Sequence, residues 1–148
     1  MSVSSGERVL CFAYGSNMCE GRMRSRVPSA HFVGVARLEA HSLRFHKKSE
    51  DGSGKADAYL TSDPRDYVLG VIYEIERRKK RDLDEAEGLG AGYTEKTVDV
   101  ITPDGRTLKT QMYFAEKGSI SPSLRPYSWY KRFVLEGARQ TRFAPRLC

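Results

Sequence analysis

The chain has 148 residues and a formal net charge of +6, because 25 lysines and arginines outnumber 19 aspartates and glutamates. This length predicts a single domain over residues 1–148, large enough to bury a core without disulfides or a metal. No stretch approaches the roughly 20 apolar residues of a membrane span, and the first residues lack a signal-peptide profile. We therefore expect a cytoplasmic protein with no membrane partner.

Cysteine and histidine patterns indicate neither a disulfide framework nor a metal site. The three cysteines form no C-x-x-C pair, and an odd number cannot all pair within one chain, so reduced cysteines are expected. The three histidines lie at none of the spacings typical of zinc sites. No metal is therefore assigned.

The positive charge has its densest run at residues 77–81, which read RRKKR. Basic runs can bind nucleic acid or another anionic partner. A basic run on a helix face is more often simply solvated, so charge alone does not lead us to expect a nucleic-acid partner.

Apolar runs separated by turn residues predict about seven strands and three helices, an α+β pattern in which antiparallel strands dominate. Residues 67–75 are almost continuously apolar, which indicates a strand buried on both faces. A helix over 18–26 is expected to stop before Pro28, and one over 77–87 to end at Gly88. The other predicted elements are strands at 9–14, 31–37, 42–46, 56–61, 93–101 and 106–115, a polar loop at 47–55 and a helix at 127–140.

A tight turn, Tyr14-Gly15-Ser16-Asn17, follows the first predicted strand. Gly15 permits positive φ, Asn17 tolerates the left-handed region and a helix follows, so backbone N–H groups can converge on an anion there. The alternative is a plain strand-to-helix turn in which Ser16 or Asn17 caps the helix, and the residue types alone favour this alternative.

Four carboxylates, Asp82, Asp84, Glu85 and Glu87, lie within six residues at the end of the second predicted helix. A solvated helix face, paired with the basic run at i,i+4, is the default for the first three. Glu87 differs because it closes the helix, where the negative end of the helix dipole and the neighbouring carboxylates raise its pKa. A carboxyl group with a raised pKa can take and return a proton near neutral pH.

Three segments share their order and spacing with one known family. They read FAYGSNM at 12–18, LDEAEG at 83–88 followed by GY at 92–93, and YKR at 130–132 with GA at 137–138. Residues 17–38 are also similar to that family, so the likeness covers residues 9 to 140. On these segments the chain resembles the γ-glutamylcyclotransferase family.

The resemblance implies a small mixed, mostly antiparallel β-barrel with flanking helices, and a reaction that needs no cofactor. In that reaction the α-amine of a γ-glutamyl group attacks its own γ-carbonyl, which gives 5-oxoproline and releases an amino acid or amine. The amine must lose a proton, the carbonyl oxygen must be stabilised and the leaving nitrogen must gain a proton. The implied partner is a small-molecule γ-glutamyl substrate, and a homodimer stays open.

Carried over residue by residue, the resemblance assigns Glu87 as the general acid/base. It also assigns the binding of substrate to the first strand's end, the turn after it and two aromatic residues: Cys11, Phe12, Ala13, Tyr14, Gly15, Ser16, Asn17, Tyr93 and Tyr130. Tyr130 is the expected hydrogen-bond donor of the two aromatic residues. The alternative for Tyr93 is core packing with a satisfied hydroxyl.

The YGSN turn looks more like that of enzymes acting on γ-glutamyl amino acids than that of the glutathione-specific or γ-glutamylamine branches. The sequence does not indicate which amino acid or amine forms the released part of the substrate. A hypothesis from a different class is a non-catalytic binding module on the same fold, which recognises an acidic ligand or nucleic acid through residues 77–81. The enzyme hypothesis requires Glu87 to share a pocket with the 14–17 turn.

Overall fold

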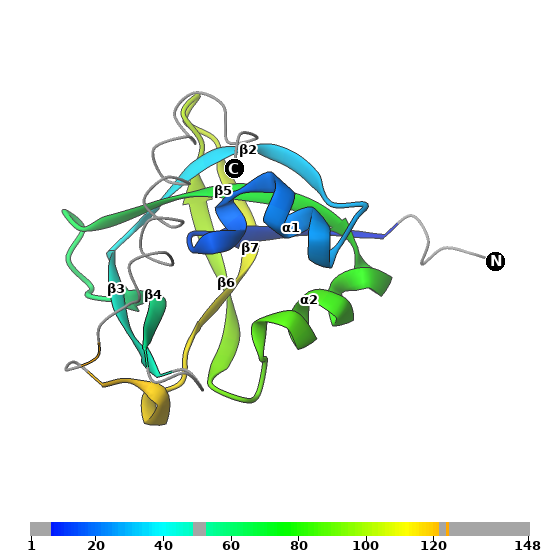
Figure 1. The fold of residues 1–148 in the computed structure, drawn as a ribbon. Coiled ribbons are helices and arrows are strands. Elements are labelled where there is room, and N and C mark those ends of the chain that lie inside the picture. Colours follow the sequence, from blue (N-terminus) through cyan, green and yellow to red (C-terminus); the bar gives the residue numbers. More distant parts are fainter. Residues whose placement is uncertain (1–6, 49–52, 122–123, 125–148) are drawn as a thin grey trace.

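The structure, a computed structural model, describes residues 7–48, 53–121 and 124. Five strands form a closed barrel in the order β1-β5-β2-β6-β7, and two more form a separate pair, β3–β4 (Figure 1). The strands are β1 (Arg8–Ala13), β2 (His31–Glu39), β3 (His41–Lys48), β4 (Gly54–Leu60), β5 (Tyr67–Glu76), β6 (Tyr93–Ile101) and β7 (Thr107–Ala115).

The barrel is mixed and mostly antiparallel, which confirms the predicted α+β fold class. All neighbouring strands run antiparallel except β1 and β7, which close the barrel in parallel. β1 pairs with β5 along its whole length, from Arg8 to Ala13, but with β7 only where Cys11 meets Gln111. The closure therefore depends on a short contact in the middle of β1.

Strand β5 runs through the centre of the core. Val71, Ile72, Tyr73 and Ile75 are fully buried, which confirms the prediction of burial on both faces. Each of the aliphatic side chains among them contributes about 1.5–3 kcal/mol to folding relative to exposure. Gly70, on the same strand, has no room for a side chain, because a Cβ atom there would lie 2.5 Å from the Ala13 carbonyl oxygen and 2.6 Å from the Phe12 ring.

Two helices lie next to each other against the barrel (Figure 1). α1 (Glu20–Arg26) ends at Val27, the residue before Pro28, and α2 (Lys80–Glu87) ends at Gly88, whose φ of 72° is left-handed. Both ends agree with the predictions. Three single 3-10 turns accompany them: η2 (Ser16–Met18), η3 (Arg77–Lys79) and η4 (Lys117–Ser119).

The predicted loop at residues 47–55 is shorter than expected. β3 continues through Lys48 and β4 begins at Gly54, because Lys47 pairs with Lys55 and Lys48 with Gly54 in an antiparallel ladder. Backbone hydrogen bonding across the pair outweighs the polar, glycine-rich composition that predicted a loop. Residues 49–52 and the helix predicted over 127–140 lie outside the described residues.

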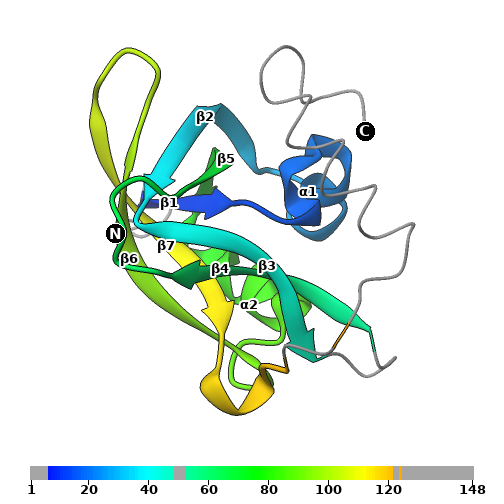
Figure 2. The same ribbon diagram turned by 90° about the vertical axis from the view of Figure 1, so that its left-hand side faces the viewer.

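The β3–β4 pair lies across the barrel (Figure 2). A buried aspartate joins the pair to the barrel. Asp57, on β4, is 2% exposed and accepts a hydrogen bond from the Ala115 backbone N–H of β7 at 2.8 Å. Its other carboxylate oxygen lies 2.6 Å from Nε2 of His46 on β3. One side chain thus joins both strands of the pair to the barrel.

Cys11 is a buried free thiol, which agrees with the expectation of reduced cysteines for this residue. Cys148 lies outside the described residues. Among the residues that the structure describes, none of the helices is long and apolar enough to span a membrane.

Candidate active site

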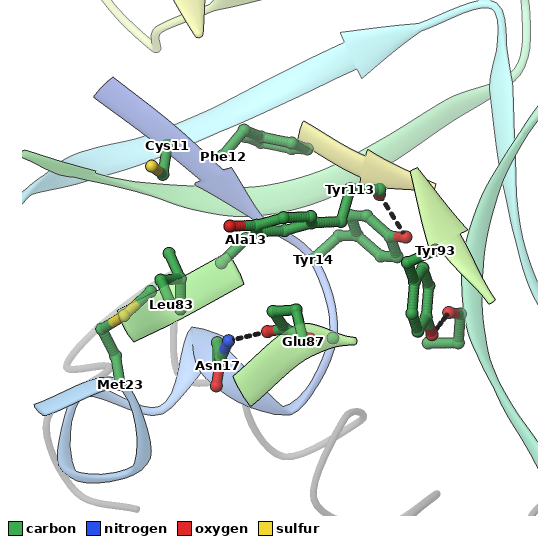
Figure 3. A pocket seen from close by; sticks show the side chains of 12 residues that line it. Cys11, Phe12, Ala13, Tyr14, Asn17, Met23, Leu83, Glu87, Tyr93 and Tyr113 are labelled. Carbon is green, nitrogen blue, oxygen red and sulfur yellow. Dashed lines mark hydrogen bonds between the residues drawn. The ribbon is translucent and has the colours of Figure 1, made fainter. Parts of the chain in front are cut away.

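A pocket opens where β1 separates from β7. Past Cys11, β1 stays paired with β5 but no longer with β7, so its β7-facing backbone groups lie outside the sheet ladder. Buried backbone groups of this kind need another hydrogen-bond partner. The pocket has an empty volume of about 490 Å³, including its open mouth, and its walls are Cys11, Phe12, Ala13, Tyr14, Gly15, Asn17, Met23, Ala56, Leu83, Glu87, Tyr93 and Tyr113 (Figure 3).

Three hydrogen bonds hold the turn at residues 14–17. The hydroxyl of Tyr14 donates to the Tyr113 carbonyl oxygen at 2.7 Å, which anchors the end of β1 to β7. The buried hydroxyl of Tyr73 donates to the Met18 carbonyl oxygen at 3.1 Å, and the Met18 N–H donates to the Gly15 carbonyl oxygen at 3.0 Å. The turn is therefore fixed from two strands of the barrel.

The capping role considered for Asn17 is not what the structure shows. The N-cap residue of α1 is Cys19, which makes no side-chain capping bond, and Ser16 belongs to η2. The Asn17 side chain points instead toward α2, where its amide N–H donates to Oε1 of Glu87 (Figure 3). The turn thus presents a polar side chain to the carboxylate.

Glu87 is the last helical residue of α2, and its side chain is 22% exposed. Nη1 of Arg26 donates to the carbonyl oxygen of the Asn17 amide and lies 3.8 Å from the Glu87 carboxylate. Asn17 is therefore held on one side by an arginine while it donates to Glu87 on the other. This arrangement fixes the Glu87 carboxylate, and its Oε1 accepts the hydrogen bond from Asn17.

Burial raises the pKa of Glu87 above its ordinary value, while the charges of Arg26, Arg22 and Lys47 and the hydrogen bond from Asn17 act against that rise. The direction agrees with the sequence prediction, but the expected causes, the helix dipole and neighbouring carboxylates, are not the main ones. A carboxylate in this environment can accept a proton and return it.

Tyr93 fits both interpretations of its role. It lines the pocket, and its hydroxyl donates to the Ala56 carbonyl oxygen at 2.6 Å, so the hydroxyl is satisfied within the protein. The ammonium of Lys47 lies 4.7 Å from the centre of its ring, in a cation–π contact. Tyr130 lies outside the described residues.

Tyr113 is the main pocket residue that the sequence did not reveal. Its hydroxyl donates to Asp84 of α2, and burial together with this bond raises its pKa. Asp84, predicted to be solvated, also accepts from Nζ of Lys80 at 2.5 Å. Tyr113 lies in an ordinary strand pattern with no motif around it. It is therefore identified only by the contact between β7 and α2 in the structure.

Cys11 lies at the inner wall of the pocket. It is 3% exposed, and burial raises the pKa of its thiol from 9.0 to about 12. The thiol is therefore protonated at neutral pH and is a poor nucleophile or metal ligand. Within the described ranges, no three His, Cys, Asp or Glu side chains are placed to hold a metal ion.

The basic run that motivated the binding-module hypothesis is largely paired with carboxylates. Arg77 lies 2.9 Å from Glu7, and Arg78 lies 2.9 Å from Glu76. Lys80 contacts Asp84, as described, and also Glu95 at 2.7 Å. Three of the five basic side chains are therefore paired with carboxylates, which reduces the excess charge that the run offers an anionic partner.

Comparison with known proteins points to one family. The family model described as "Gamma-glutamyl cyclotransferase, AIG2-like" matches residues 11–132. The human protein named "Gamma-glutamylcyclotransferase" is 34% identical over 139 residues, which is 90% of this chain and 72% of the human one. The bovine protein of the same name is 35% identical over 141 residues, with 91% and 72% covered.

Solved structures agree with this relationship. One described as "Gamma-glutamyl cyclotransferase" superposes with a TM-score of 0.83 at 31% identity, covering 93% of this chain and 82% of the other. A yeast cyclotransferase specific to glutathione shares the fold, with a TM-score of 0.72 at 16% identity over 91% of this chain and 88% of its own. This chain belongs to the γ-glutamyl cyclotransferase, AIG2-like family.

Proposed function

We propose that this protein is a γ-glutamylcyclotransferase that acts on γ-glutamyl amino acids with Glu87 as general acid/base. One observation carries the assignment of the site. Glu87 and the turn at residues 14–17 come from distant parts of the chain, yet they line one pocket and are joined by the Asn17 hydrogen bond. The enzyme hypothesis required this arrangement, and the binding-module hypothesis did not.

The reaction begins when Glu87 takes a proton from the α-ammonium of the γ-glutamyl group. The free amine then attacks the γ-carbonyl carbon of the same group, and a five-membered ring forms. Holding the flexible substrate with its amine against its carbonyl supplies the proximity that makes this intramolecular attack fast. The pocket walls formed by Phe12 and Tyr113 restrict the substrate to such a folded shape.

Negative charge develops on the γ-carbonyl oxygen during the attack. We assign its stabilisation to the backbone N–H groups of the turn at residues 14–17, which the barrel holds in place before substrate arrives. When the intermediate collapses, the bond to the leaving nitrogen breaks and Glu87 returns its proton to that nitrogen. The ring nitrogen, which still carries two protons after the attack, passes one of them through Glu87 to the released amine, which leaves as an ammonium. The products are 5-oxoproline and the free amino acid, and Glu87 regains its charge.

Asn17 and Arg26 position the carboxylate for both proton transfers. Because Asn17 engages Oε1 of Glu87, the second oxygen is left to face the substrate. Arg26 fixes the Asn17 amide in the orientation that donates to Glu87. Tyr93 closes one wall of the pocket, and Tyr130 is proposed from the resemblance to donate a hydrogen bond to the substrate.

The test is formation of 5-oxoproline from γ-glutamyl-alanine by wild-type protein, Glu87→Gln and a matched control, Glu85→Gln. Glu85 is an exposed neighbour on the same helix, so its substitution should leave kcat within about twofold. Glu87→Gln keeps the shape and the bond from Asn17 but cannot take a proton, which should lower kcat by about 10²–10⁴-fold. Full activity in Glu87→Gln would remove Glu87 as the base, and no product from wild type across a panel of γ-glutamyl donors would remove the activity.

The proposal also includes the remaining predictions made from the sequence. The protein is proposed to act in the cytoplasm as one domain over residues 1–148, on a small-molecule substrate and without a cofactor. A homodimer stays a prediction, which sedimentation equilibrium of the purified protein measures directly.

A further inference from the structure

The proposed function assigns no contact to the released half of the substrate. In a γ-glutamyl amino acid this half carries a carboxylate, whose carbon lies about 2.5 Å from the leaving nitrogen across two covalent bonds. Glu87 must reach that nitrogen to protonate it. A residue that binds the carboxylate therefore has to lie beside Glu87 and the pocket.

Lys47 meets this requirement. It lies near the end of β3, and its Nζ is 4.7 Å from the centre of the Tyr93 ring, which forms a wall of the pocket. Its charge is close enough to act on Glu87. The neighbouring Gly92 leaves the space that the lysine fills, because a Cβ atom there would lie 2.8 Å from both Cε and Nζ of Lys47.

Positively charged side chains therefore lie on two sides of the Glu87 carboxylate. Arg26 lies with Asn17, at the side formed by the turn. Lys47 lies on Tyr93, and Figure 3 shows Asn17 and Tyr93 on opposite sides of Glu87. A γ-glutamyl amino acid carries the complementary negative charges, because one carboxylate lies on each side of the amide bond that breaks.

We propose that Lys47 binds the carboxylate of the released amino acid and so makes the enzyme prefer γ-glutamyl amino acids to γ-glutamylamines. This inference rests on the proposed function, which places the γ-glutamyl group against the turn and leaves the Tyr93 side to the released half. A lysine is a compact charge on a flexible stem. It can therefore hold the carboxylate that all amino acids share without selecting among their side chains.

The experiment compares two donors that differ only in this charge, γ-glutamyl-alanine and γ-glutamyl-alanine amide. The kcat/KM for each is measured with wild type, Lys47→Met, Lys47→Arg and Lys48→Met. Lys48 is the matched control, since it is the next residue of β3, is exposed and points to the opposite face of the strand. The measured quantity is the ratio of kcat/KM for the acid to that for the amide.

Lys47→Met should lower this ratio about tenfold, the lower part of the range for a charge-assisted hydrogen bond, because the site is partly open to solvent. Activity on the amide, measured at a pH where Glu87 is ionised in both proteins, should fall less than activity on the acid, and the activity that remains shows that the variant is folded. Lys47→Arg should keep most of the preference, and Lys48→Met should keep all of it.

Two outcomes would overturn the proposal. If Lys47→Met lowers kcat/KM equally for both donors, Lys47 acts on Glu87 or on the γ-glutamyl carboxylate instead. An unchanged ratio with unchanged activity would remove any role in binding. If wild type cyclises neither donor, the proposed function fails by itself, and calorimetric binding of the two donors to the same four proteins then tests Lys47 separately.

Discussion

Replacing Asp57 with alanine should destabilise the protein strongly, although Asp57 lies outside the catalytic pocket. The carboxylate is 2% exposed and is the acceptor for two groups, the Ala115 backbone N–H and Nε2 of His46. His46 is itself only 8% exposed, so water cannot readily replace the lost partner. Asp57→Ala therefore leaves two buried donors unsatisfied at the junction between β4 and the barrel.

The expected cost follows from these two donors. A buried donor left without an acceptor costs about 1–3 kcal/mol, so Asp57→Ala should cost about 2–6 kcal/mol of unfolding free energy. At about 2–4 °C for each kcal/mol in a protein of this size, the melting temperature should fall by about 4–24 °C. Asp57→Asn keeps an acceptor for Ala115 and should cost only about 1–2 kcal/mol.

Urea and thermal unfolding, followed by circular dichroism, measure these differences. Asp99→Ala is the matched control, since Asp99 is an exposed strand aspartate whose ion pair with Lys109, at 3.2 Å, is on the surface. Its loss should change stability by less than about 1 kcal/mol. If Asp57→Ala costs no more than Asp99→Ala, the β3–β4 pair is not held to the barrel by this carboxylate.

Two further predictions concern the pocket. Because burial raises the pKa of Glu87 and the reaction needs its ionised form, kcat/KM should fall as the pH drops through a value above the ordinary 4.5, and Arg26→Gln, which removes an opposing charge, should move this fall to still higher pH. A fall centred at or below 4.5 in the pH profile would contradict this reasoning. The thiol of Cys11, with a pKa of about 12 instead of 9.0, should react with iodoacetamide about a thousandfold more slowly in folded than in urea-unfolded protein at pH 8. Peptide mapping by mass spectrometry measures both rates, and equal rates would show that the pocket wall leaves this thiol open to solvent.

Local sequence signals predicted the elements that carry the site. The residue before Pro28 and the left-handed Gly88 end their helices where expected, because both effects act within one or two residues of the chain. The position of Glu87 at a helix end followed from Gly88 alone. Its place beside the turn at residues 14–17 came from the family resemblance, since residue types there favoured a plain turn.

Contacts between distant segments could not be predicted in the same way. Tyr113 and Asp84 meet because β7 and α2 pack together, and neither residue lies in a recognisable motif. The polar composition around Lys47 predicted a loop, whereas pairing with β4 makes it part of a strand. The rise in the Glu87 pKa comes mainly from burial, which depends on the whole fold and not on the neighbouring carboxylates in the sequence.

Gly70 influences the shape of the pocket, although it is not one of the residues that line it. The residue lies on β5 behind the pocket, yet it leaves no space between its Cα atom, the Ala13 carbonyl and the ring of Phe12. Any larger residue there would displace Phe12 or Ala13, both of which line the cavity. The width of the site is therefore set in part by a residue that no substrate touches. A substitution at Gly70 can therefore change the shape of the site without changing any residue that lines it.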